Sequence, residues 1–324
     1  MRLSSDGINW LNAGLMVAAC AAAYAAPFHL FLFSYAVLGP LHYFTEISWL
    51  HDRDYFAGRA PGRWWWLALV AAAMAVLMYG YVSNDLLQRP VSPKYEIALV
   101  YLVFVTAAIV LYVRRAVSAL ALAAVSLAAL AVFSSVQAYF VVAYLLVTIV
   151  HVLLFTAAFV LHGALRLKSR SALVSLAVFV ACAVSFFLWR LPGAPPPESV
   201  RRVYDFFAPL NTQLLALFRF DAGDIYESAA ALAVMRLIAF AYTYHYLNWF
   251  SKTSIIRWHE VGHGRAVAIV ALWVGAVGLY LHDYTIGLAF LYLLSLLHVL
   301  LEFPLDHQTF VGIGKELRAA VAGG

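Results

Sequence analysis

The sequence predicts an all-α membrane protein, a single bundle of about ten transmembrane helices over residues 1–324. Three observations lead to this fold class. Hydrophobic residues make up 65% of the chain, charged residues only 11%, and the mean hydropathy is +0.86. Soluble domains have about 25% charged residues, so a bundle solvated by lipid is the expected architecture.

Each predicted span is a mostly apolar run of about 20 residues, which is the length that crosses a bilayer. Proline, glycine-rich turns or clustered charge separate the runs, and each of these features ends a spanning helix. The predicted spans are 8–26, 28–50, 64–83, 96–113, 116–133, 136–162, 171–190, 229–250, 262–281 and 286–303. The proline-rich segment 192–228 is predicted to lie outside the membrane or at its surface.

The lysines and arginines orient this bundle. With the N-terminus in the cytoplasm, 14 of the 21 basic residues lie on the inner side and six on the outer side, and Arg236 lies within a span. Cytoplasmic loops carry the excess of basic residues, so both termini are expected inside, in a bacterial-type cytoplasmic membrane. The first apolar run is expected to be a retained helix and not a signal peptide. The net charge of +5 is ordinary loop charge and indicates no nucleic-acid partner.

This orientation gathers eight of the eleven histidines at the inner face. They are His42, His51, His162, His245, His259, His263, His298 and His307. His29 and His282 lie on the other face and His151 near mid-depth, and for these three a structural hydrogen-bonding role is expected.

Two predicted helices pair a histidine with a glutamate four residues later, His42 with Glu46 and His298 with Glu302. Residues four apart share one helix face, and ionisable groups within a span usually face the bundle interior. Imidazoles and carboxylates without nearby thiols are typical ligands of iron, manganese or zinc. The alternative is that each is a hydrogen-bonded structural pair or part of a proton relay.

A His-Glu-x-x-His pattern, His259 to His263, lies between two predicted spans. On a helix, this spacing places two zinc ligands on one face, with Glu260 as the base that activates water. The alternative is a charged cap at the start of the next helix, because helix N-termini favour acidic residues.

These patterns give a set of candidate residues. Glu260 is the candidate catalytic residue, as a ligand or a proton carrier. Arg236 is a candidate for binding an anionic headgroup or substrate, or for pairing with Glu227. The candidate metal ligands are His42, Glu46, His245, His259, His263, His298, Glu302 and His307. The residues expected to support or replace these ligands are His51, Asp52, His162 and Asp306.

The His259-Glu260-Val261-Gly262-His263 stretch resembles a histidine box of the integral-membrane non-haem iron oxygenases and desaturases, the alkane hydroxylase group in particular. The resemblance implies one or two irons at the cytoplasmic face, a hydrophobic lipid-like substrate and a separate electron donor. The chain departs from that family in lacking a His-x-x-His-His box and in having ten predicted spans where four to six are usual.

Two other functions stay open from the sequence. One is an intramembrane zinc protease or hydrolase that binds zinc through His259 and His263, with Asp306 as third ligand. The other is a proton-coupled transporter, in which Glu46, Glu302 and the histidines carry protons.

Overall fold

The computed structural model describes residues 4–56, 60, 62–81, 83, 93–132, 145, 147–220 and 223–322, and these residues form helices and connecting segments with no strand. The predicted all-α class is therefore confirmed for this part of the chain. Three helices begin after a serine whose side chain caps the helix N-terminus. The hydroxyls of Ser4, Ser169 and Ser228 accept hydrogen bonds from the first-turn amides of their helices, which satisfies donors that have no partner within the helix.

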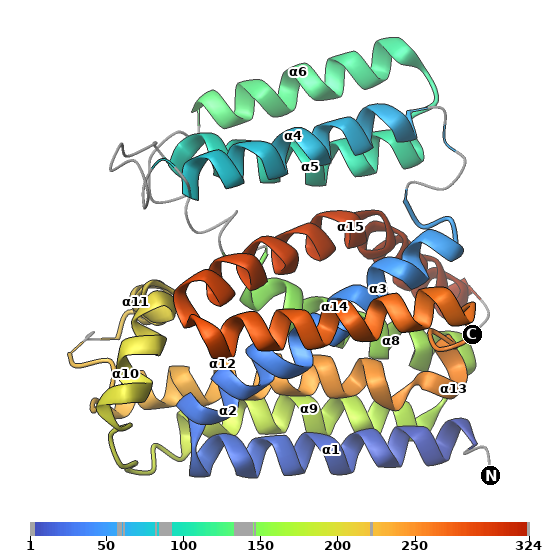
Figure 1. Ribbon diagram of the computed structural model, residues 1–324. Helices are drawn as coiled ribbons and strands as arrows, with labels where there is room; N and C mark the ends of the chain where they lie inside the picture. The colour runs from blue at the N-terminus through green and yellow to red at the C-terminus, as the bar shows by residue number, and fades with distance from the viewer. Residues whose placement is uncertain are drawn as a thin grey trace.

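The centre of the molecule is α12 (Ala229–Ser251), in which 18 of 23 residues are buried. It lies against α1 (Ser5–Ala25) and α9 (Arg170–Leu188), as Figure 1 shows. Its other side packs on a continuous helical path made of α2 (Pro27–Phe33), the π-helical segment η1 (Ser34–Leu38) and α3 (Gly39–Asp52). The most buried helix is thus the one that carries Arg236, His245 and several tyrosines.

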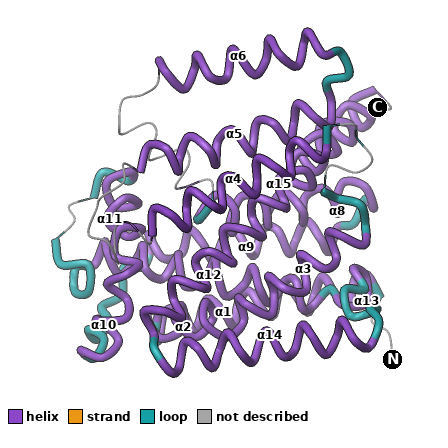
Figure 2. Tube along the Cα trace, turned by 45° about the horizontal axis from the view of Figure 1, so that its top comes forward, coloured by secondary structure: helices purple, strands orange, loops and turns teal. Residues whose placement is uncertain are grey.

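A second group of helices closes the bundle around α12. It consists of the π-helical segment η3 (Val150–Phe155), α8 (Thr156–Leu167), α14 (His263–His282) and α15 (Tyr284–Ala322). The long α15 packs on α3, α8 and α14, and its opposite side contacts α4 (Arg63–Tyr81) and α5 (Pro93–Tyr112). With α6 (Ala116–Val132), these two helices form a separate layer over α15 (Figures 1 and 2).

Short helices fill the remaining connections. The predicted extramembrane segment contains α10 (Glu198–Tyr204), the 3₁₀ turn η4 (Asp205–Phe207) and α11 (Ala208–Leu217). A short α13 (Thr253–Ile256) follows α12.

Among the described residues, six helical stretches are long and apolar enough to cross a membrane, and they indicate an integral membrane protein. They are Ser5–Ala25, Arg63–Gly80, Val150–Leu167, Arg170–Leu188, His263–His282 and Tyr284–Ala322. The ten predicted spans are not confirmed. The apolar parts of α5 and α6 are shorter, the predicted span 28–50 is divided by η1, and part of the predicted span 136–162 lies outside the described residues.

The helix that contains the last predicted span, 286–303, continues past Pro304 to Ala322. As a consequence, His298, Glu302 and Asp306 follow one another at intervals of four on the same helix, so all three lie on one face.

Candidate metal centre

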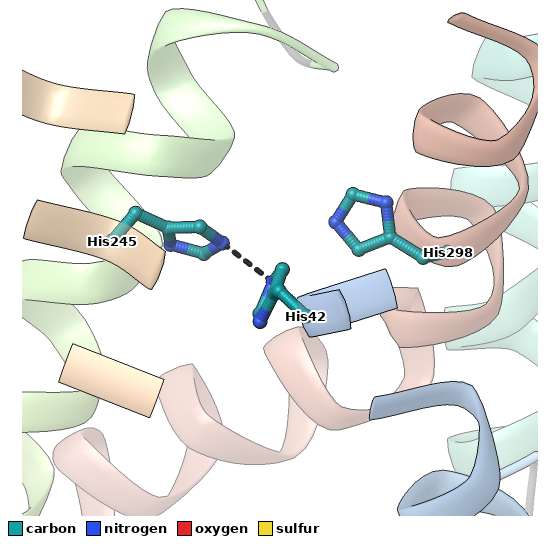
Figure 3. A group of neighbouring side chains, drawn as sticks. All are labelled: His42, His245 and His298. Carbon is teal, nitrogen blue, oxygen red and sulfur yellow. Dashed lines mark hydrogen bonds between the residues drawn. The ribbon is translucent and has the colours of Figure 1, made fainter. Parts of the chain in front are cut away.

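Three buried histidines from three helices converge at the middle of the bundle. His42 comes from α3, His245 from α12 and His298 from α15, and Figure 3 shows their rings turned toward a common space. The Nε2 atoms of His42 and His245 lie 3.0 Å apart. One ligand nitrogen from each of the three rings falls within 4.8 Å of the others. These three residues were predicted as metal ligands, and the structure brings them together.

A second group shares His298 with the first. It adds Glu302, from the same helix, and His151, from η3. The Nε2 atom of His151 lies 3.4 Å from Oε2 of Glu302, and the His151 ring centroid lies 5.1 Å from that of His245 and 5.2 Å from that of His298. Glu46 lies beside them, with Oε2 2.9 Å from Nε2 of His42. The two groups and Glu46 form one cluster, defined here as His42, Glu46, His151, His245, His298 and Glu302.

The sequence analysis assigned His151 a structural role and so missed a member of this cluster. His151 has no acidic residue four positions away, and the pairing rule that singled out His42 and His298 could not find it. One signal was available, because an ionisable residue in mid-span is costly and usually functional.

Two π-helical segments flank the cluster. His151 lies within η3, and η1 ends one turn before His42. Such segments are rare and occur frequently at functional sites. In η1, the Ser34 hydroxyl lies 2.8 Å from that of Thr243 on α12, and this contact joins the two helices that carry His42 and His245.

Neighbouring side chains fix the rings. Nδ1 of His245 lies 2.9 Å from the Thr156 hydroxyl, so its Nε2 is left to face His42. His298 stacks on the ring of Tyr43 with centroids 4.2 Å apart, and the Tyr43 hydroxyl bonds that of Tyr246 at 2.6 Å. Such contacts typically orient metal-binding histidines.

Many polar atoms of the cluster have no hydrogen-bond partner within the described part of the protein. Oε2 of Glu46 lies 2.9 Å from Nε2 of His42, but the two are not aligned for a hydrogen bond. The other unpartnered atoms are Nδ1 of His42, both ring nitrogens of His151 and of His298 and Oε2 of Glu302, and next to the cluster both carboxylate oxygens of Asp306. Buried polar groups are almost always bonded, and a bound ion is one partner that would satisfy these atoms.

The donor set fits a metal ion. Two ligands at about 2.1 Å from a metal and at right angles to each other are about 3.0 Å apart, which matches the separation of the His42 and His245 nitrogens. Imidazoles and carboxylates suit iron, zinc or manganese. The two cysteines, Cys20 and Cys182, belong to neither group of potential ligands. The cluster could therefore hold a metal ion, and its residues do not decide which metal.

A cavity of about 390 Å³ leads to the cluster from one end of the bundle. His42, Glu46, His245 and Glu302 line it. This volume lies within the range of small-molecule binding sites.

The His-Glu-x-x-His stretch lies elsewhere. His259 and Glu260 are exposed in a turn, and α14 begins only at His263. The two histidines are thus not four apart on one helix, which the zinc motif requires. Glu260 pairs with Arg257 at 3.8 Å. Neither group of described residues that could hold a metal includes His259, Glu260 or His263. The stretch precedes α14, but the N-cap residue is Gly262, no side chain caps this helix and its first turn holds no acidic residue, so the capping alternative is not found either.

The remaining predicted residues take different places. His307 donates from Nε2 to the carbonyl of Phe104 on α5 and lies outside the cluster. His162 lines the cavity. Asp306 is buried on the face of α15 that carries Glu302. His51 is exposed, 3.3 Å from Asp52.

Asp52 is tied to α14 and not to the cluster. The guanidinium of Arg265 donates to its carboxylate at 2.6 Å. This hydrogen bond lowers the pKa of Asp52 below its usual value, because it favours the ionised form.

Arg236 is nearly fully buried and holds the backbone that follows α9. Its guanidinium donates to the carbonyls of Leu191 and Pro192 at 2.6 and 3.2 Å and lies over the ring of Tyr24. The pairing with Glu227 considered from the sequence is not found, because Glu227 pairs with Arg201. These contacts give Arg236 a structural role.

Comparisons of the chain with protein-family models, curated proteins and solved structures found no match.

Proposed function

We propose that this protein is a membrane-embedded non-haem iron oxygenase or desaturase that acts on a hydrophobic, lipid-like substrate. The observation that carries the proposal is the buried cluster of four imidazoles and two carboxylates, in which several ligand atoms lack a hydrogen-bond partner among the described residues. A group of this composition suits Fe(II).

In this proposal, the residues of the cluster bind the metal or carry protons. His42, His245, His298, His151 and Glu302 would hold one or two iron ions, and Glu46 would be a ligand or a proton carrier. When bound, iron would supply the activation of dioxygen. The rings of Tyr43, Tyr246 and Trp249 pack around His42, and by limiting the access of water they would protect a reactive oxidant from side reactions.

The membrane arrangement belongs to the same proposal. Ten spans with both termini inside would place the cavity mouth at the cytoplasmic face of a bacterial-type inner membrane. A lipid-like substrate would then reach the site from the bilayer, and a separate electron donor would dock from the cytoplasm.

Elemental analysis of the purified, detergent-solubilised protein tests the proposal. The expected result is one or two irons per chain, lost in His298→Ala. The matched control is His282→Ala, because His282 is exposed and lies outside the cluster. The double variant His259→Ala/His263→Ala should retain the iron.

Each other outcome would overturn the proposal. Zinc that is lost only with His259 and His263 would support the hydrolase alternative. Absence of metal after reconstitution with iron, zinc and manganese would leave the buried acids and imidazoles as proton-relay groups, and transport assays would be the next step.

A further inference from the structure

The cavity becomes more exposed and more basic from its inner end at the cluster, called the floor here, to its outer end, called the mouth. The floor residues His42, Glu46, His245 and Glu302 are buried. Toward the other end, Lys252 and His162 are partly buried and Arg166 is exposed. This gradient in exposure gives the cavity a direction, from an open basic mouth to the closed cluster.

The mouth carries two cations that lack an anionic partner. Of the residues that the structure describes, no carboxylate forms an ion pair with Lys252 or Arg166, and both acids that line the cavity belong to the floor. Both cations lie at helix C-termini, where the helix dipole favours them. That preference accounts for their positions in the chain. It does not account for their lining one cavity.

The wall between mouth and floor has an aromatic and aliphatic part, made of Trp49, Tyr55, Phe159, Trp249, Ile256 and Leu305, and a polar part, made of Thr156, Asn248, Gln308 and Thr309. Lys252 follows His245 by seven residues at the end of α12, and a helix rises about 1.5 Å per residue. The mouth and the cluster are therefore about 10 Å apart along the helix axis.

We infer that the cavity binds an amphiphile with an anionic head, a carboxylate or a phosphate. The head lies between Lys252 and Arg166, and the apolar part extends along the aromatic wall toward His42 and His245. The inference names the substrate class of the proposed iron site and so rests on the proposed function. A buried or half-buried cation binds such a head strongly because the hydrogen bonds are charge-assisted.

Binding of dodecyl compounds tests this inference. The protein is placed in nanodiscs of neutral phosphatidylcholine and titrated, by calorimetry, with dodecyl phosphate, laurate and dodecanol. The two anionic compounds should bind at least tenfold more tightly than dodecanol. The double variant Lys252→Gln/Arg166→Gln should lose this tenfold preference.

The matched control is Lys168→Gln. Lys168 is exposed, follows Arg166 by two residues and does not line the cavity. It should bind all three compounds as the unchanged protein does. Inorganic phosphate and acetate test the anion without a chain, and nanodiscs with added phosphatidylglycerol test whether a two-chain membrane lipid competes for the mouth.

The outcomes separate this inference from the proposed function. If the protein contains iron but binds laurate and dodecanol equally tightly, the inference is overturned and the oxygenase proposal stands. Binding of inorganic phosphate as tight as that of dodecyl phosphate would also overturn it, because no chain would then be recognised. A His298→Ala protein that loses its metal but keeps the preference for anionic heads would support it. A preference that survives in the double variant would place the anion elsewhere and refute it.

Discussion

Replacement of His298 by phenylalanine should separate the stability of the protein from its ability to bind metal. Without metal, both ring nitrogens of His298 are buried and unpartnered. Each such group costs about 1–3 kcal/mol. Phenylalanine removes both nitrogens and keeps the stacking on Tyr43, but its larger ring costs about 1–3 kcal/mol of overpacking. The gain of about 2–6 kcal/mol less the cost of about 1–3 kcal/mol makes the metal-free variant about 2 kcal/mol more stable than the unchanged protein at the middle of these ranges, and between about 1 kcal/mol less stable and about 5 kcal/mol more stable at their ends.

Addition of metal should reverse this order. A ligand that binds only the folded state stabilises it by about 4 kcal/mol at a thousand times its Kd. The unchanged protein should gain this amount and His298→Phe should gain little. The assay is equilibrium unfolding in mixed micelles, with chelator or with anaerobic Fe(II), and His282→Phe is the exposed control. A metal-free variant destabilised by more than about 2 kcal/mol, or stabilised by iron as much as the unchanged protein, would refute the reasoning.

Three further predictions follow from the contacts around the site. Thr156→Val removes the hydroxyl that contacts Nδ1 of His245 and should weaken metal binding about 10–100-fold, as measured by competition with a chelator. Thr156→Ser, which keeps the hydroxyl, should bind metal as the unchanged protein does. Unchanged metal affinity in the valine variant would contradict the role assigned to Thr156. Arg236→Met leaves two carbonyls without their donors and should lower the free energy of unfolding by about 2–4 kcal/mol. The metal content of the folded fraction should stay unchanged. Loss of metal without loss of stability would instead support a role of Arg236 in binding. Burial lowers the pKa of Lys252, which lies outside the six candidate spans, to about 8. Only the ammonium form binds an anion, so the affinity for dodecyl phosphate should fall by up to about tenfold between pH 7 and pH 9 as this group loses its proton. Lys252→Arg, which like Arg166 stays charged in this range, should remove most of that dependence, and an identical pH profile in both proteins would exclude Lys252 as the titrating group.

The candidate metal centre could be predicted only in part from the sequence. The pairs His42 with Glu46 and His298 with Glu302 were found because spacing along a helix is enough to place two side chains on one face. The same rule failed at His259 and His263, because it applies only where the intervening residues are helical, and here they form a turn. Spacing could not indicate His151, which meets the cluster through contacts with His245 on α12 and with His298 and Glu302 on α15.

The sequence by itself determined the all-helical class, the apolar helices that suit a bilayer and the residue types available for metal binding. These depend on composition and on periodicity within single helices, which are local properties of the chain. The tertiary structure decided which helix faces meet, and so which imidazoles share one buried space and which remain at the surface. It also decided that Arg236 holds backbone carbonyls. Contacts of this kind join residues far apart in the chain, and they depend on how helices pack.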